Sequence, residues 1–293
     1  MYWTGRRLVR GRRDGRLVQD LPALRRVMPA LMRTRVEGTI YYTQHLDVER
    51  LMDWLEEVNA DRTGHDRITF FHVFLTAYAR LFRQRPELNR FVSGGRTYQR
   101  EEIAFSFTVK QAMTDEAGEV QANVVFSGTE TVADVCGTIR EALAEARGPG
   151  RSEGDRLIDT LVRMPAPVLA GVARTVWALD RANLMPRFLQ EALPIYASSY
   201  LVNLGSLGAE APFHHLYQNG TTSIFVAIGT ISPQPVVVQD EVVIRRRVAI
   251  VYTIDERVPD GFYLVRSADL LQQMFDDPAS LTRPPGGEAS EDA

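Results

Sequence analysis

The C-terminal third of the chain joins long apolar strands to a single helix, and this order constrains the fold most. TTSIFVAIGTI (221–231) is typical of a strand, and PQPVVVQDEVVIRRRVAIVYTIDE (233–256) reads as two strands joined by a polar turn. An amphipathic pattern from Phe262 to Phe275 predicts a closing helix. Glu256 stands at the junction, four residues before Asp260.

The preceding residues alternate between the two kinds of element. Strand patterns occur at 38–48, 101–113 and 119–128, and helix patterns at 47–60, 68–86 and 129–148. The segment 68–86 is apolar on most sides, so we expect a buried helix that ends at Pro86. The sequence therefore predicts an α/β (α+β) domain with a mixed sheet flanked by helices.

Composition excludes several classes of function. The chain has 293 residues, 45% hydrophobic and 24% charged, with a net charge of −3, which gives no overall field for nucleic acid. The one cysteine, Cys136, cannot form a disulfide within the chain, and we expect a reducing, cytoplasmic location. We find no secretory signal, no run of about 18 apolar residues, and no metal, P-loop or dinucleotide motif.

The two ends differ from the middle. Residues 1–23 form a basic segment that suits a solvated arm, an oligomer strap or a weak anion-binding patch. Residues 282–293 are short, polar and acidic, as expected of a disordered tail. Residues 24–281 are then the single folded domain.

An added helical segment spans about 155–193 and is broken by Pro165, Pro167 and Pro186. It is too interrupted to span a bilayer. Its apolar faces suit three roles: a lid on the domain, an oligomer contact, or a helix resting on a membrane surface.

Four blocks in order resemble one known family. They are RPELNRFV (85–92), NLGSLG (203–208), TTSIFVAIGTI (221–231) and DERVPDGFYLVRSADLLQQMFDDPASL (255–281). The chain is similar to the catalytic domain of the 2-oxo acid dehydrogenase dihydrolipoyl acyltransferases, which share the chloramphenicol acetyltransferase fold. The resemblance implies a homotrimer with active sites between subunits, and coenzyme A or acyl-CoA opposite an acyl carrier or small-molecule acceptor. We expect a free-standing core with no lipoyl group.

Two catalytic side chains of the family are replaced. The family motif D-H-R-x-x-D-G reads Asp255 to Gly261 here, with Glu256 in the place of the histidine base. The serine of T-I-S-N-L-G, which donates to the oxyanion, is Val202. The pKa of a glutamate is about 4.3 and that of a thiol about 8.5, so full proton transfer from the thiol to the glutamate costs about 5 to 6 kcal/mol. Burial would raise the pKa of the glutamate and lower this cost.

Other residues are candidates for the site. The resemblance implies coenzyme A near Asn203, Gly205 and Ser206. His214 and His215 follow these turns, and each suits either a replacement base or a histidine that bonds backbone carbonyls.

Asp260 matches a family aspartate that forms a loop-ordering salt bridge, with Arg26 as a possible partner. Two functions of different class therefore follow. One is an acyltransferase with altered or weakened machinery, and the other is a non-catalytic trimeric scaffold or ligand-binding protein on the same fold.

Overall fold

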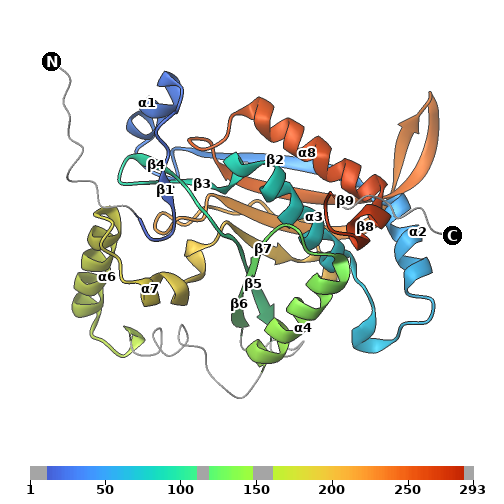
Figure 1. Ribbon diagram of the computed structural model, residues 1–293, viewed down its shortest axis with the longest axis horizontal. Helices are drawn as coiled ribbons and strands as arrows, with labels where there is room; N and C mark the ends of the chain where they lie inside the picture. Colours follow the sequence, from blue (N-terminus) through green and yellow to red (C-terminus); the bar gives the residue numbers. More distant parts are fainter. Residues whose placement is uncertain (1–11, 111–118, 148–160, 287–293) are drawn as a thin grey trace.

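A six-stranded mixed sheet forms the centre of the computed structural model, which describes residues 12–110, 119–147 and 161–286 (Figure 1). The strand order is β2-β9-β8-β7-β5-β6. The bounds are β2 (Thr39–Asp47), β5 (Ile103–Lys110), β6 (Glu119–Phe126), β7 (Ser199–Asn203), β8 (Ile224–Val238) and β9 (Glu241–Asp255). β7 pairs in parallel with β5 and β8, and the other pairs are antiparallel. The predicted mixed sheet is confirmed.

Helices cover one face of this sheet (Figure 1). They are α2 (Glu49–Val58), α3 (Phe70–Gln84), α4 (Val132–Arg147) and α8 (Gly261–Asp276). As the apolar pattern predicts, α3 is the most buried, and its Tyr78 and Phe82 rings lie 5.0 and 5.4 Å from the ring of Phe105 on β5. Thr69 caps α3 in a reciprocal box with His72.

The opposite, outer face of the sheet carries a smaller apolar cluster. Tyr200, Phe225 and Val251 come from three adjacent strands and lie under Leu216 of the 204–223 connection. This face is less covered than the helical one, and it holds the polar groups described below.

The N-terminal segment joins a second, small sheet. The strand order of this sheet is β1 (Arg16–Leu17), β4 (Arg96–Gln99) and β3 (Arg90–Ser93). Helix α1 (Ala23–Leu31) follows β1 in the chain. Residues 12–23 of the expected basic arm thus lie partly within the fold, and the Arg12 side chain is buried. Residues 1–11 lie outside the described residues.

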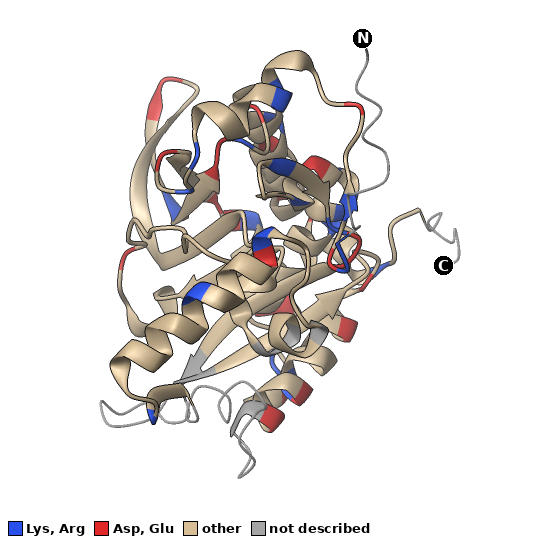
Figure 2. Cartoon of the chain, turned by 90° about the vertical axis from the view of Figure 1, so that its left-hand side faces the viewer, with Lys and Arg blue, Asp and Glu red and all other residues tan. Residues whose placement is uncertain are grey.

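The added segment forms α6 (Ala166–Arg181) and α7 (Arg187–Ala192), which begin after Pro165 and Pro186 as predicted. The break predicted at Pro167 is wrong, because Pro167 lies in the first turn of α6, where proline is tolerated. Figure 2 views this side of the molecule, where charged residues are sparse along α6. Arg12 holds the end of α6, since its Nη2 lies 2.9 Å from Asp180 Oδ1. Residues 155–160 lie outside the described part, and within that part no helix has the length and hydropathy to cross a bilayer.

The ends of β8 and β9 extend beyond the sheet as a two-stranded hairpin (Figure 1). Its turn residues Gln239 and Asp240 have φ of 51° and 67°, as in the tight turns that match strand twist. Val237, Val242 and Ile244 are 70%, 72% and 65% exposed.

The C-terminal end of the domain is anchored by a buried arginine. Arg80 donates to the backbone oxygens of Ser280, Leu281 and Arg283. The chain is therefore held at least to Arg283, one residue beyond the start of the expected tail. Residues 287–293 lie outside the described residues.

Candidate active site

The turn that carries Glu256 is fixed by its two neighbours. Asp255 is fully buried, and Arg257 donates to it from Nε at 2.7 Å and from Nη2 at 2.6 Å. The Glu256 amide donates to the carbonyl of Gly38 at 2.7 Å. The Glu256 backbone is therefore held on both sides, while its side chain is half-buried with no described partner.

Asp260 makes no ion pair with a described residue of its own chain, and the salt bridge that the resemblance implies stays a prediction. Its Oδ1 accepts from the backbone N–H of Tyr263 at 2.7 Å, so it is the N-cap of α8. Arg26 is exposed and makes no described ion pair. Instead Arg25 lies at this turn, where its Nη1 donates to the carbonyls of Glu256 and Pro259 at 2.9 and 3.2 Å.

The residues expected to contact coenzyme A form a tight turn at the end of β7. Ser206 donates to the Asn203 carbonyl at 2.9 Å, and the Asn203 side chain accepts from the Ser206 amide at 3.3 Å. A Cβ on Gly205 would overlap the carbonyl oxygen of Gly229, so this glycine allows two backbones to approach. These contacts explain the turn, and coenzyme A binding here stays a prediction.

Glu256 and the turn at Asn203 lie at opposite ends of the sheet. Val202 is level with Ala227 on β8 and Val251 on β9. Glu256 comes five residues after Val251, which corresponds to roughly 17 Å along the strand direction. A single chain therefore does not bring the two catalytic positions of the family together.

His214 lies on the outer face of the sheet. Its ring stacks on Phe225 with centroids 3.8 Å apart and 2° between planes, and its Nδ1 is 2.7 Å from the His215 carbonyl. Because a carbonyl only accepts, Nδ1 carries the proton and Nε2 keeps its lone pair. Burial lowers the pKa of His214, which favours this neutral ring. His215 is exposed.

Three polar side chains lie on the same face beside Val202, and the sequence reasoning missed them. Tyr200 OH donates to Gln121 Oε1 at 2.6 Å, and Thr108 Oγ1 lies 2.7 Å from Tyr200 OH. Gln121 Nε2 completes the ring to Thr108 at 3.3 Å. We call Tyr200, Thr108 and Gln121 the outer polar group. One N–H of the Gln121 amide is not used in this ring, so a donor exists near the position of the lost serine.

The nearest hydroxyls considered from the sequence are elsewhere. Ser199 faces the helices, where it lies 3.1 Å from Tyr78 OH and donates to the Ile224 carbonyl at 3.1 Å. Ser206 is exposed in the turn. Strand parity excludes Ser199 correctly, and the same parity could have placed Tyr200 on the face of Val202, although it does not indicate Thr108 or Gln121.

No cluster of three or more histidine, cysteine or carboxylate side chains suited to a metal occurs among the described residues. The groups that could act on a substrate are thus a carboxylate, a neutral imidazole and amide or hydroxyl donors. These are the elements of proton transfer and of carbonyl-oxygen stabilisation.

Comparison with known proteins identifies a matching family over part of the chain. Residues 197–283 match the family of 2-oxoacid dehydrogenases acyltransferase (catalytic domain), a segment that contains Asn203, His214 and Glu256. In a comparison of sequences alone, no curated protein matches the chain.

Solved structures share the fold over most of the chain. A probable dihydrolipoamide acetyltransferase from Listeria monocytogenes is 14% identical with a TM-score of 0.59, covering 88% of this chain and 94% of that one. The dihydrolipoamide acetyltransferase from Azotobacter vinelandii is 14% identical, with a TM-score of 0.58 and coverage of 90% and 93%. Work on that enzyme addresses the role of a serine, a histidine and an asparagine in its mechanism.

A chloramphenicol acetyltransferase is 12% identical with a TM-score of 0.50, covering 89% of this chain and 99% of that one. At these identities the likeness shows the fold alone. The resemblance read from the sequence is thereby confirmed, and the chloramphenicol acetyltransferase-like fold with it.

Proposed function

From the fold of the dihydrolipoamide acetyltransferases and the family match over residues 197–283, we propose that this protein is an acyltransferase. It moves an acyl group from a thioester of coenzyme A or of a carrier to a small acceptor. The observation that carries the proposal is the held turn at Glu256. The buried pair of Asp255 and Arg257 holds this position on both sides while the carboxylate stays accessible.

The proposal includes assembly into a homotrimer. In one chain Glu256 lies roughly 17 Å along the strands from the level of Val202, beside which the outer polar group lies. A complete site then needs Glu256 from one copy and the outer face of β7 from another. This is the arrangement that the family resemblance implies.

Each group has a chemical role in this scheme. Glu256 takes the proton of the attacking thiol or hydroxyl, or binds the cationic group of an amine acceptor. The remaining Gln121 N–H stabilises the carbonyl oxygen of the thioester as it gains negative charge, and the hydroxyls of Tyr200 and Thr108, whose protons are used within the outer polar group, hold that amide in place. His214 is the second candidate base, since its neutral Nε2 is available.

The test is release of free thiol from acetyl-, butyryl- and octanoyl-CoA in the presence of thiol, hydroxyl and amine acceptors. Glu256→Gln keeps the size of the side chain and removes the charge, and we expect it to lower kcat/KM by about 10²-fold, the scale of general base catalysis. Glu57→Gln, on an exposed residue of α2, is the matched control. Background rates for all donors, or equal rates for the wild type and Glu256→Gln, would overturn the proposal.

A second candidate function is a trimeric scaffold or ligand-binding protein without turnover. The observation that favours it is the joint replacement of the family imidazole and hydroxyl by Glu256 and Val202. A trimer by light scattering that binds acyl-CoA and releases no thiol supports this function. A monomer counts against both functions, because both depend on the same assembly.

A further inference from the structure

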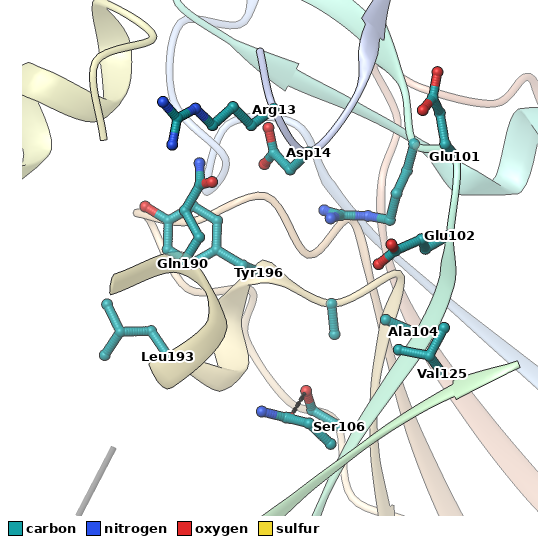
Figure 3. Close-up of a pocket in the computed structure, with 13 residues that line it drawn as sticks. Arg13, Asp14, Glu101, Glu102, Ala104, Ser106, Val125, Gln190, Leu193 and Tyr196 are labelled. Atoms are coloured by element: carbon teal, nitrogen blue, oxygen red, sulfur yellow. Dashed lines mark hydrogen bonds between the residues drawn. The ribbon is translucent and has the colours of Figure 1, made fainter. Parts of the chain in front are cut away.

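A cavity of about 610 Å³ lies on the outer face of the sheet, next to the outer polar group, since its wall residue Ser106 is level with Tyr200 on β7 (Figure 3). Its walls come from β5 and the three residues before it, β6, α7 and the segment that follows it, and residues 13–14 of the N-terminal segment. Neither Glu256 nor Val202 nor Asn203 lines it. A volume of this size suits a small organic ligand.

Arg100 is a buried cation in the wall of this cavity. It is 7% exposed, and Nη2 donates to Thr221 Oγ1 at 2.5 Å. Its guanidinium lies over the ring of Phe91, 4.9 Å from the centroid. Among the described residues, the bond to Thr221 is the one hydrogen bond that the five N–H groups of the Arg100 side chain make. No carboxylate of the described residues lies within ion-pair distance of Arg100.

Two of the carboxylates near Arg100 are engaged with Arg12. Asp14 and Asp180 both pair with Arg12, at 2.7 and 2.9 Å. Arg100 is therefore a buried charge without a direct ion pair, which Asp14 and Glu102 compensate only from a longer distance, and such an arrangement favours an anion beside it. Burial also lowers the pKa of Arg100 to about 10.

The Tyr196 hydroxyl is a second buried polar group of the cavity. The Tyr196 hydroxyl is buried, with the residue 6% exposed, and makes no hydrogen bond of ordinary geometry to a described residue. Burial raises the pKa of Tyr196, and the nearby Asp180 carboxylate raises it further, so the hydroxyl stays protonated and able to donate. In Figure 3, Gln190 and Arg13 lie on the same side of the cavity as Tyr196.

The rest of the wall sets the size and character of a ligand. Val125 and Leu193 offer an apolar surface, and Ser106 is already bonded to Asn123 at 2.5 Å. Glu101 and Glu102 are exposed and line the other side (Figure 3). Their charges disfavour a polyanion, so one anionic group with an apolar body fits this wall best.

We propose that this cavity binds a small organic anion, with its carboxylate or phosphate group on Arg100 and its apolar body against Val125 and Leu193. A guanidinium fork matches both oxyanions. The Tyr196 hydroxyl and the Gln190 amide are further donors. This site goes beyond the proposed acyl transfer, because it uses none of the residues assigned to that reaction.

The test is a calorimetric titration with benzoate and with phenyl phosphate, at constant ionic strength set with chloride. We expect saturable binding of at least one of the two, and the one that binds identifies the headgroup. Val125 is 58% exposed, so Val125→Glu places a repelling carboxylate at the cavity without disturbing the core, and we expect at least tenfold weaker binding.

Val242→Glu is the matched control, because it makes the same change at a residue 72% exposed on the hairpin, and it retains full affinity. Arg100→Gln removes the charge, and we expect a folded Arg100→Gln variant to show no binding. If this variant does not fold, the comparison of Val125→Glu with Val242→Glu is the test. The proposal is overturned if neither probe binds, or if Val125→Glu binds the probe as tightly as the wild type does. Since the readout is binding without turnover, that result leaves the acyltransferase proposal standing.

Discussion

The Arg257 side chain donates two hydrogen bonds, of 2.7 and 2.6 Å, to the Asp255 carboxylate, and one residue separates the two in the sequence. That residue is Glu256. Both partners are buried, and Arg257 also donates to the Met32 carbonyl at 3.1 Å. The pair therefore ties the end of β9 to the segment after α1, and it sets where the candidate base can lie.

Breaking this pair should destabilise the domain. Asp255→Asn leaves the Arg257 charge buried without a counterion, and we expect a loss of about 3 to 5 kcal/mol in the free energy of unfolding, measured in urea. Asp53→Asn is the control, since Asp53 is exposed and pairs with Arg246 at the surface, where the expected cost is under about 1 kcal/mol. Equal losses for the two variants contradict the structural role of the pair.

Restoring the family side chains should increase activity. Glu256→His together with Val202→Ser returns an imidazole and an outward hydroxyl, and we expect thiol release from acetyl-CoA to rise at least about tenfold. The two single variants should each give a smaller gain. A double variant that folds as stably as the wild type and gains nothing shows that the two positions do not share a site.

Gly205 should resist substitution. Gly205→Ala places a methyl group against the Gly229 carbonyl, and we expect a loss of about 1 to 3 kcal/mol in stability by thermal denaturation. Gly171 in α6 has open space around its Cβ position, so Gly171→Ala should stabilise by about 0.5 to 1 kcal/mol. A tolerant Gly205→Ala would mean that the turn and β8 separate easily.

Stability should fall as the pH drops below about 6.5, the ordinary pKa of histidine. Burial lowers the pKa of His72, with a smaller contribution from the charge of Arg140 on α4. The unfolded chain then binds more protons than the folded one between the lowered pKa and about 6.5, so acid favours unfolding. Protonation also removes the lone pair with which His72 Nδ1 accepts from the Thr69 amide.

The control for this pH dependence is His72→Gln. Glutamine can make the same capping contact without titrating. The free energy of unfolding measured at pH 7.5 and 5.5 should change less in His72→Gln than in the wild type. If His72→Gln and the wild type lose the same free energy of unfolding between pH 7.5 and 5.5, a group other than His72 causes the pH dependence.

The fold could be predicted from the sequence because its signals are local. The buried helix predicted over 68–86 is observed at Phe70–Gln84, and the strand, turn, strand and helix after residue 221 occur in the predicted order. Each depends on periodicity, a proline or a polar turn within a few residues. The blocks of the family resemblance lie on these same elements.

The outer polar group could not be predicted in the same way. Thr108 and Tyr200 meet because β5 and β7 pair in parallel, although 92 residues separate them in the chain. Single-sequence patterns show which residues share a face of one strand and do not show which strand lies next to it. The arginine at this turn is a similar case, because Arg26 was predicted and Arg25 is observed. A helix turns by about 100° per residue, and tertiary packing sets which side chain of α1 faces the turn.

The cavity at Arg100 also depends on distant segments. Gln190 and Leu193 come from the added segment, Arg13 from the N-terminal one, and Arg100 from the end of β4. A lone arginine in a strand-rich region is usually exposed. Only the packing of these three segments shows that this one is buried.

The hairpin at the end of β8 and β9 has a practical consequence for handling the protein. Val237, Val242 and Ile244 contact water there, so the core gains nothing from them and the domain loses little if they become polar. They are also the side chains through which dilute molecules would adhere to each other and to vessel walls. Replacing these three residues with polar ones should therefore reduce non-specific adhesion at little cost to folding.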